Sequence, residues 1–221
     1  MAHVSTTLKR KFLRAAHNGK TKKMVELLNT ANNEHDYQYN KRIVGLPSMS
    51  LVFERKRLLR ENRKISRCIT KHNLINVVDH RMNRTALHWA CEKGKINAAK
   101  VALANGSNIN EVDNHGQTAL HVTCKHCSVN RTFLHLLLLL LDEGAKLDMI
   151  DSNGYTPLMI AVVNGNIDIV KILLMYGANI YIETNIGYFR KTAIDLADDK
   201  KQEEILQLLL RYVYQNDEDI T

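Results

Sequence analysis

The sequence is poor in cysteine, proline and long apolar runs. Its 221 residues include four cysteines and two prolines, which excludes a disulfide-rich secreted scaffold and a proline-rich linker. No purely apolar run is longer than those at residues 136–141 and 158–163, and both are far shorter than the roughly 20 residues that cross a bilayer. Lys9, Arg10, Lys11 and Arg14 interrupt the first residues, so no secretory signal is expected. We therefore expect a protein of the cytoplasm, the nucleus or both that is not secreted.

Sequence patterns that carry catalysis are also missing. The chain has no nucleophile elbow, no phosphate-binding glycine loop, no paired-carboxylate motif and no cluster of acid and base residues. Single Asp and His residues in turns are usually structural. We therefore expect no enzymatic activity, no catalytic residues and no cofactor.

What the sequence does contain is a repeat. Thr85, Thr118, Thr156 and Thr192 lie 33, 38 and 36 residues apart, and each begins a similar segment. A period of this length indicates a stacked repeat. Each threonine can accept a hydrogen bond from a free N–H group at the start of a helix. Left-handed helix ends are expected at Gly106, Gly144 and Gly177.

Three segments carry a resemblance to a known family. RTALHWA at residues 84–90, QTALH at 117–121 and YTPLMIA at 155–161 resemble the Thr-Pro-Leu-His-x-Ala signature of the ankyrin repeat. The resemblance implies an all-α ankyrin-repeat solenoid of stacked helix-turn-helix units joined by β-hairpin-like turns, with about five to six repeats including caps. It also implies that the motif histidines, His88 and His121, hydrogen-bond the turn. Met159 and Asp195 replace them in the later units.

We expect one domain over residues 1–221. Its predicted units are an N-terminal capping repeat (1–37), a degenerate basic repeat (38–78), three repeats (79–112, 113–150 and 151–182) and a C-terminal capping repeat (183–221). The unit 113–150 carries an insertion between its helices, around residues 127–132. In the first cap, residues 12–19 are predicted to form the first helix and its turn, and residues 24–28 the second helix. In the last cap the second helix is predicted over residues 204–214.

The resemblance also predicts a partner-binding surface. In ankyrin arrays the hairpin tips and the exposed ends of the inner helices point into a concave groove, so we expect a monomeric, non-enzymatic protein-binding module, an adaptor or inhibitor, that does not act at membranes. Residues 84–91 and 180–183 are similar to segments of gankyrin, an ankyrin-repeat protein. The predicted partner-binding residues are His80, Arg81, Met82, Arg84, Glu92, Lys93, Asn114, His115, Gln117, Lys125, His126, Ser152, Asn153, Tyr155, Asn164, Tyr181, Tyr188 and Phe189.

The charge is distributed unevenly. Residues 1–78 hold 17 Lys and Arg against 5 Asp and Glu, whereas residues 79–221 hold 14 against 18. A basic helix is predicted over residues 53–71, and its patch consists of Arg55, Lys56, Arg57, Arg60, Arg63 and Lys64. A solvated helix face, an acidic protein partner and nucleic acid are three explanations of this patch. The alternative function is therefore a nuclear, nucleic-acid-associated or transcription-regulating protein, for example one similar to the ankyrin inhibitors of NF-κB.

One constellation suggests a metal. Cys124 and Cys127 have His121 nearby, and such residues can bind zinc. No second Cys-x-x-Cys pair follows at zinc-finger spacing, and Cys124 occupies the same repeat position as Cys91, where small side chains pack between units. We therefore expect ordinary thiols and no metal. The other hypothesis, a metal-dependent enzyme at these residues, requires stoichiometric bound metal.

Overall fold

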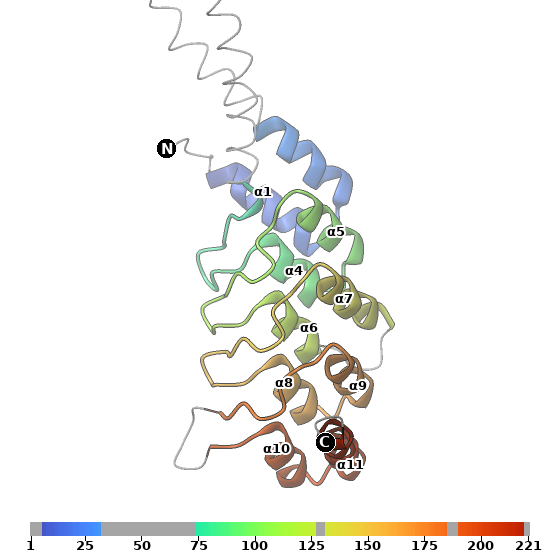
Figure 1. Ribbon diagram of the computed structural model, residues 1–221. Coiled ribbons are helices and arrows are strands. Elements are labelled where there is room, and N and C mark those ends of the chain that lie inside the picture. Colours follow the sequence, from blue (N-terminus) through green and yellow to red (C-terminus); the bar gives the residue numbers. More distant parts are fainter. Residues whose placement is uncertain (1–5, 32–73, 127–130, 185–189, 219–221) are drawn as a thin grey trace, which may run out of the picture.

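The chain folds as a row of helix pairs stacked side by side. The computed structural model describes residues 6–31, 74–126, 131–184 and 190–218, and every regular element in these ranges is a helix. Figure 1 shows the pairs following one another from α1 at one end of the row to α11 at the other. The inner row, into which the hairpins lead, comprises α1 (Thr6–His17), α4 (Ala86–Glu92), α6 (Ala119–His126), α8 (Pro157–Val163) and α10 (Ala193–Asp199). The outer row comprises the helix over residues 21–31, α5 (Ile96–Ala104), α7 (Arg131–Asp142), α9 (Ile167–Met175) and α11 (Glu203–Glu218).

The inner helices pack both within their unit and across units. α4 contacts α1, α5 and α6, and α8 contacts α6, α9 and α10. Apolar surface is therefore buried between neighbouring units, as in other stacked repeats. The predicted all-α solenoid is confirmed, and the segments around Thr85, Thr118 and Thr156 lie next to one another.

Threonines fix the starts of the inner helices. The Thr85 side chain accepts a hydrogen bond from the backbone N–H of His88, and the His88 ring accepts one from the backbone N–H of Thr85, which completes a capping box. Thr156 accepts from the backbone N–H of Met159 at 3.2 Å, and the proline that follows occupies the first turn, where no N–H group is needed. The predicted role of the threonines as helix caps is confirmed.

The outer helices end at left-handed glycines. Gly106, Gly144 and Gly177 have φ values of 83°, 81° and 83°, a conformation that costs glycine little because it has no Cβ atom. The first cap also has a left-handed glycine, between its two helices. α1 ends at His17, and Gly19, with φ 69°, leads into the helix over residues 21–31. The left-handed helix ends are confirmed, but both helices of the first cap begin earlier than predicted, since α1 begins at Thr6 and the next helix covers residues 21–31.

The leucine run lies in α7. Leu136, Leu137, Leu140 and Leu141 are buried, and the two leucines between them are half-buried. The run is therefore part of a helix packed into the stack. Over the part of the chain that the structure describes, no helix combines the length and the hydropathy that a membrane crossing needs.

Several predicted features fall partly or wholly outside the described residues. They include most of the degenerate repeat 38–78 and the core of the insertion, residues 127–130. At the C-terminal end, α11 spans Glu203–Glu218 and is longer than the helix predicted over residues 204–214.

Gly116, at the tip of a hairpin, is the glycine whose replacement we expect to cost the most. It has φ 69°, and a Cβ atom built on it would lie 2.9 Å from the backbone nitrogen of Ser152 in the next hairpin. That nitrogen donates to the carbonyl of His115 at 2.8 Å, so it cannot move away freely. We expect Gly116→Ala to lower the free energy of unfolding by about 2 kcal/mol, measured by urea denaturation followed by circular dichroism.

Gly144→Ala is the matched control. Gly144 has φ 81°, but a Cβ atom there would meet no atom within 4 Å. This variant should show the backbone strain alone, about 1 kcal/mol. Equal losses in the two variants would mean that the approach of the two hairpins contributes nothing.

Candidate functional site

The three hairpins that begin at Asp79, Asp113 and Asp151 are each held closed by that aspartate. The Asp113 Oδ1 atom accepts from the backbone N–H groups of His115 at 2.8 Å and Gln117 at 3.0 Å. Asp79 and Asp151 hold their own hairpins in the same way. These aspartates were not predicted as site residues, although an aspartate five or six positions before Thr85, Thr118 and Thr156 is a recurring signal.

The first hairpin, from Asp79 to Thr85, contains one residue more than the next two. Asn83 adopts φ 55°, at the place where the next two hairpins have Gly116 and Gly154. Asparagine tolerates the left-handed region better than most residues. The extra residue is therefore absorbed without loss of the turn.

Neighbouring hairpins are joined by hydrogen bonds. The Asn114 backbone N–H donates to the carbonyl of Met82 at 2.9 Å, and its side-chain amide donates to the carbonyl of Arg81 at 3.0 Å. The Ser152 N–H donates to the His115 carbonyl in the same manner. The tips therefore form one continuous edge. We name this edge the hairpin surface, and its exposed residues are His80, Arg81, Asn114, His115, Ser152 and Asn153.

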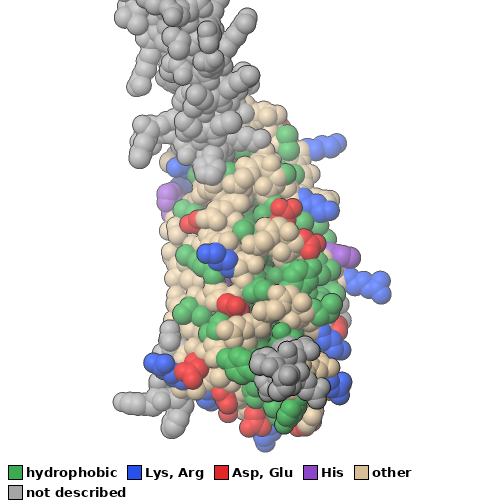
Figure 2. Space-filling view, viewed as in Figure 1, with side chains coloured by type: hydrophobic (Ala, Val, Ile, Leu, Met, Phe, Trp, Pro, Cys, Tyr) green, Lys and Arg blue, Asp and Glu red, His purple; other side chains and the backbone are tan. Residues whose placement is uncertain are grey.

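The ends of the inner helices continue the hairpin surface. Lys93, Lys125, His126 and Asn164 are exposed, and the Asn164 amide donates to the carbonyl of Lys125 at 3.4 Å. On the face drawn in Figure 2, the hairpin side at the left presents mainly backbone and uncharged polar groups with scattered charges, whereas hydrophobic side chains gather toward the outer row.

The exposure expected for Arg84 is wrong. Its side chain is only 7% exposed, and its Nε atom donates to Asp113 Oδ2 at 2.9 Å while Nη1 pairs with Glu92. Burial by itself would raise the pKa of Asp113, but hydrogen bonds from Arg84 and from the hairpin N–H groups outweigh it and hold the pKa below the ordinary value of 3.8. Arg84 therefore joins two repeats through Asp113, whereas Glu92, half-buried beside it, pairs with Arg84 within the same repeat.

The exposure expected for Gln117 is also wrong. Gln117 is buried, and its amide donates to Asp151 Oδ2 at 3.1 Å. It occupies the same place before the capping threonine as Arg84, where the side chain points at the aspartate of the next hairpin. Tyr155, at the same place one unit later, is half-buried against the core.

The motif histidines also join successive hairpins. His88 Nδ1 lies 2.9 Å from Thr85 Oγ1, and its Nε2 lies 3.0 Å from the carbonyl oxygen of Gln117. His121 makes the equivalent contacts with Thr118 at 2.8 Å and with the Tyr155 carbonyl at 3.2 Å. Burial lowers the pKa of both histidines. The hydrogen bond to the turn that the resemblance implied is confirmed.

The described cysteines near His121 are buried inside the stack. Cys91 and Cys124 are buried, and burial raises the pKa of Cys91 to about 12, so this thiol is unreactive. Both ring nitrogens of His121 are already hydrogen-bonded within the hairpins. Among the described residues, no three His, Cys, Asp or Glu side chains are grouped so as to hold a metal ion, and Cys127 lies outside them.

The remaining predicted site residues are placed as follows. Tyr181 is 62% exposed, and Met82, in the hairpin of residues 79–84, is half-buried. Tyr188 and Phe189 lie outside the described residues. The same holds for the basic patch of Arg55, Lys56, Arg57, Arg60, Arg63 and Lys64.

Comparison with known proteins agrees with this architecture. A family model described as ankyrin repeats (3 copies) matches residues 56–138, 103–184 and 126–220. An ankyrin repeat protein of Variola virus is 36% identical over 88 residues, which is 40% of this chain and 15% of that protein. The B-cell lymphoma 3 protein homolog of Mus musculus is 38% identical over 112 residues, which is 48% of this chain and 24% of that protein.

A third relative is matched over a longer stretch. An ankyrin repeat protein of Fowlpox virus is 33% identical over 168 residues, which is 67% of this chain and 47% of that protein. The chain thus spans less than half the length of each of these three relatives. With the matched repeats, the capping threonines, the bridging histidines and the stacked hairpins in place, the chain belongs to the ankyrin-repeat family.

Proposed function

We propose that the chain is a non-enzymatic adaptor or inhibitor that binds a protein partner on the hairpin surface and the adjoining ends of the inner helices. Ankyrin repeats are generally protein-interaction modules. The observation that carries the proposal is the continuous row of hydrogen-bonded hairpin tips, because it combines a fixed backbone with side chains that the stack does not use.

The hairpin residues form two groups, buried ones that hydrogen-bond within the stack and exposed ones that do not, and this difference supports the proposal. Asp113 and Gln117 are committed to the stack. By contrast, the side chains of His80, His115 and Asn153 are exposed and make no hydrogen bond or ion pair with any described residue. A backbone that is already fixed loses little further conformational entropy when a partner binds.

A second candidate function is a regulator of transcription factors of the NF-κB type. The local similarity to the mouse B-cell lymphoma 3 protein homolog favours it. In this case the chain acts as a monomer in the cytoplasm or the nucleus. It uses the same hairpin surface, so both candidates share one test.

The test compares the hairpin surface with the outer row. We expect the double variant His115→Ala with Asn153→Ala to bind a partner captured from cells at least about tenfold more weakly, since two central contacts are lost. Surface plasmon resonance with the identified partner measures the change, and circular dichroism checks the fold. Lys100→Ala with Lys171→Ala, at exposed positions on α5 and α9, is the matched control. Loss of binding in the control variant alone would move the site to the outer row.

A further inference from the structure

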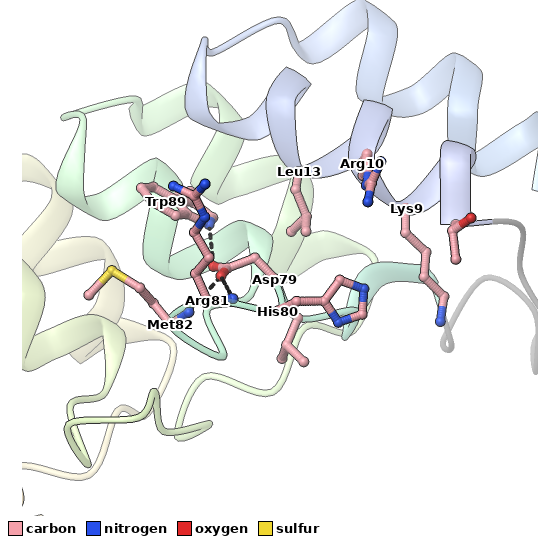
Figure 3. A pocket seen from close by; sticks show the side chains of 10 residues that line it. Lys9, Arg10, Leu13, Asp79, His80, Arg81, Met82 and Trp89 are labelled. Carbon is pink, nitrogen blue, oxygen red and sulfur yellow. Dashed lines mark hydrogen bonds between the residues drawn. The ribbon is translucent and has the colours of Figure 1, made fainter.

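A pocket lies at the N-terminal end of the hairpin surface. It has a volume of about 570 Å³ and lies between α1 and the hairpin of residues 79–84, next to α4 (Figure 3). Lys9, Arg10 and Leu13 line it from α1, Arg81 and Met82 line it from the hairpin, and Trp89 lines it from α4. Because Arg81 belongs to both, the pocket is continuous with the hairpin surface.

One wall of the pocket is apolar and rigid. Leu13 is buried, and Met82 and Trp89 are half-buried. The Trp89 Nε1–H donates to Asp79 Oδ2 at 3.1 Å, and its ring meets the ring of His17 edge-on with centroids 5.3 Å apart. Because the indole is held in place before any ligand arrives, binding against it requires little ordering.

The rim of the pocket is cationic. Within the described parts of the chain, Lys9, Arg10 and Arg81 form no ion pair with a carboxylate. Asp79 is the carboxylate in the lining, and it is already used by the hairpin. Its Oδ1 atom accepts from the N–H groups of Arg81 and Met82, and its Oδ2 atom accepts from Trp89. The three cations are therefore available to an anionic ligand.

We propose that this pocket receives an acidic segment of the protein partner, which inserts one apolar side chain. The apolar side chain packs against Leu13, Met82 and Trp89, and the flanking carboxylates meet Lys9, Arg10 and Arg81. The inference rests on the proposed function and adds to it the chemistry of the partner at one end of the surface. Charge complementarity of this kind selects a partner and speeds its association.

Other occupants match the pocket less well. Residues 32–73 of the chain are predominantly basic and would be repelled by the rim. The acidic residues of α11 lie at the opposite end of the stack from α1 (Figure 1), so they could reach the pocket only from a second copy. Nucleobases bind by stacking on aromatic faces, but the Arg84 guanidinium carbon already lies over the Trp89 ring, 5.5 Å from its centroid.

Trp89 gives a direct readout, because it is the chain's single tryptophan. The probe is a synthetic peptide with aspartates and glutamates on both sides of one phenylalanine, and it contains no tryptophan or tyrosine. We expect a saturable change in the tryptophan emission of the full chain on titration with this peptide. Replacement of the phenylalanine in the peptide by glycine should weaken binding about tenfold.

Charge variants test the rim. Lys9→Glu with Arg81→Glu should raise the Kd of the peptide about tenfold or more, and Lys9→Glu alone, which leaves the hairpin unchanged, about threefold. Lys100→Glu with Lys171→Glu, which changes the net charge equally on the outer row, should leave the Kd within about twofold. Circular dichroism verifies that each variant is folded.

Four results would overturn the proposal. The first two are no emission change with the peptide and an unchanged Kd in the Lys9 and Arg81 variant. The third is tighter binding of a single-stranded oligothymidylate than of the peptide. The fourth is an emission change that depends on protein concentration without peptide and disappears when residues 217–221 are removed. The third result would assign the pocket to nucleic acid, and the fourth would assign it to a second copy of the chain. If any of them occurs while His115→Ala with Asn153→Ala still loses the captured partner, the proposed function stands and only the pocket assignment fails.

Discussion

Replacement of Arg84 by methionine is expected to lower the free energy of unfolding by about 3 to 5 kcal/mol. The Asp113 side chain is fully buried, at 0% exposure, and Arg84 is the cation that pairs with it. Methionine fills a similar volume but leaves this carboxylate, and the partly buried Glu92, without the buried cation. Urea denaturation at neutral pH, followed by circular dichroism, measures the loss.

Two controls separate the ion pair from general packing. Lys93 is the other cation next to Glu92, but it is 39% exposed, so Lys93→Met should cost less than about 1 kcal/mol. In a double-mutant cycle, Asp113→Asn should recover part of the loss in the Arg84→Met background, because no buried charge then remains at that position. A loss in Arg84→Met no larger than that in Lys93→Met would show that Asp113 does not need its partner.

The sequence was sufficient to predict the architecture but not the burial of Arg84 and Gln117. The threonine spacing and the glycines act within one repeat, and they predicted the helix caps and the stack. The residue before the capping threonine looks exposed when one hairpin is considered alone. Its partner is the aspartate of the next hairpin, so its burial becomes evident only when two hairpins are placed side by side.

The pocket could not be predicted for a related reason. Lys9 and Leu13 belong to the first unit and Trp89 belongs to a later one, and no motif links them. Their proximity depends on α1 packing directly against α4, although residues 18–85 separate the two helices in the sequence. A pocket whose lining residues are far apart in the sequence can be recognised only from the three-dimensional structure.

The second large effect is expected at His121. His121→Ala should lower the free energy of unfolding by about 3 kcal/mol, because it leaves a cavity and deprives three polar groups of a partner. Those groups are the side chain and N–H of Thr118 and the carbonyl of Tyr155. Urea denaturation measures the loss.

The next repeat supplies a natural control. Met159 occupies the equivalent position, is 1% exposed, and still donates its N–H to the capping threonine. His121→Met should therefore fill the cavity without replacing the hydrogen bonds, and its cost should be roughly half that of the alanine variant. Equal costs would show that the hydrogen bonds, and not the volume, account for the whole effect.

The same variant tests the pH dependence of stability. Burial lowers the pKa of His121 in the folded chain below the ordinary value of 6.5, so as the pH falls the unfolded chain takes up the proton first. The contribution of this group is complete above pH 6.5 and is lost as the pH falls through the folded pKa, with a slope of at most about 1.4 kcal/mol per pH unit.

His88 has a lowered pKa for the same reason, so the parent chain should lose stability through both histidines and His121→Met through one. Denaturation midpoints between about pH 8 and about pH 5 give the two slopes. A shallower slope in the variant would locate this acid sensitivity at the contact between consecutive hairpins, since His121 touches Thr118 in one hairpin and Tyr155 in the next. An unchanged slope would mean that the imidazole takes up a proton in the folded chain as readily as in the unfolded one, which its burial between the hairpins argues against.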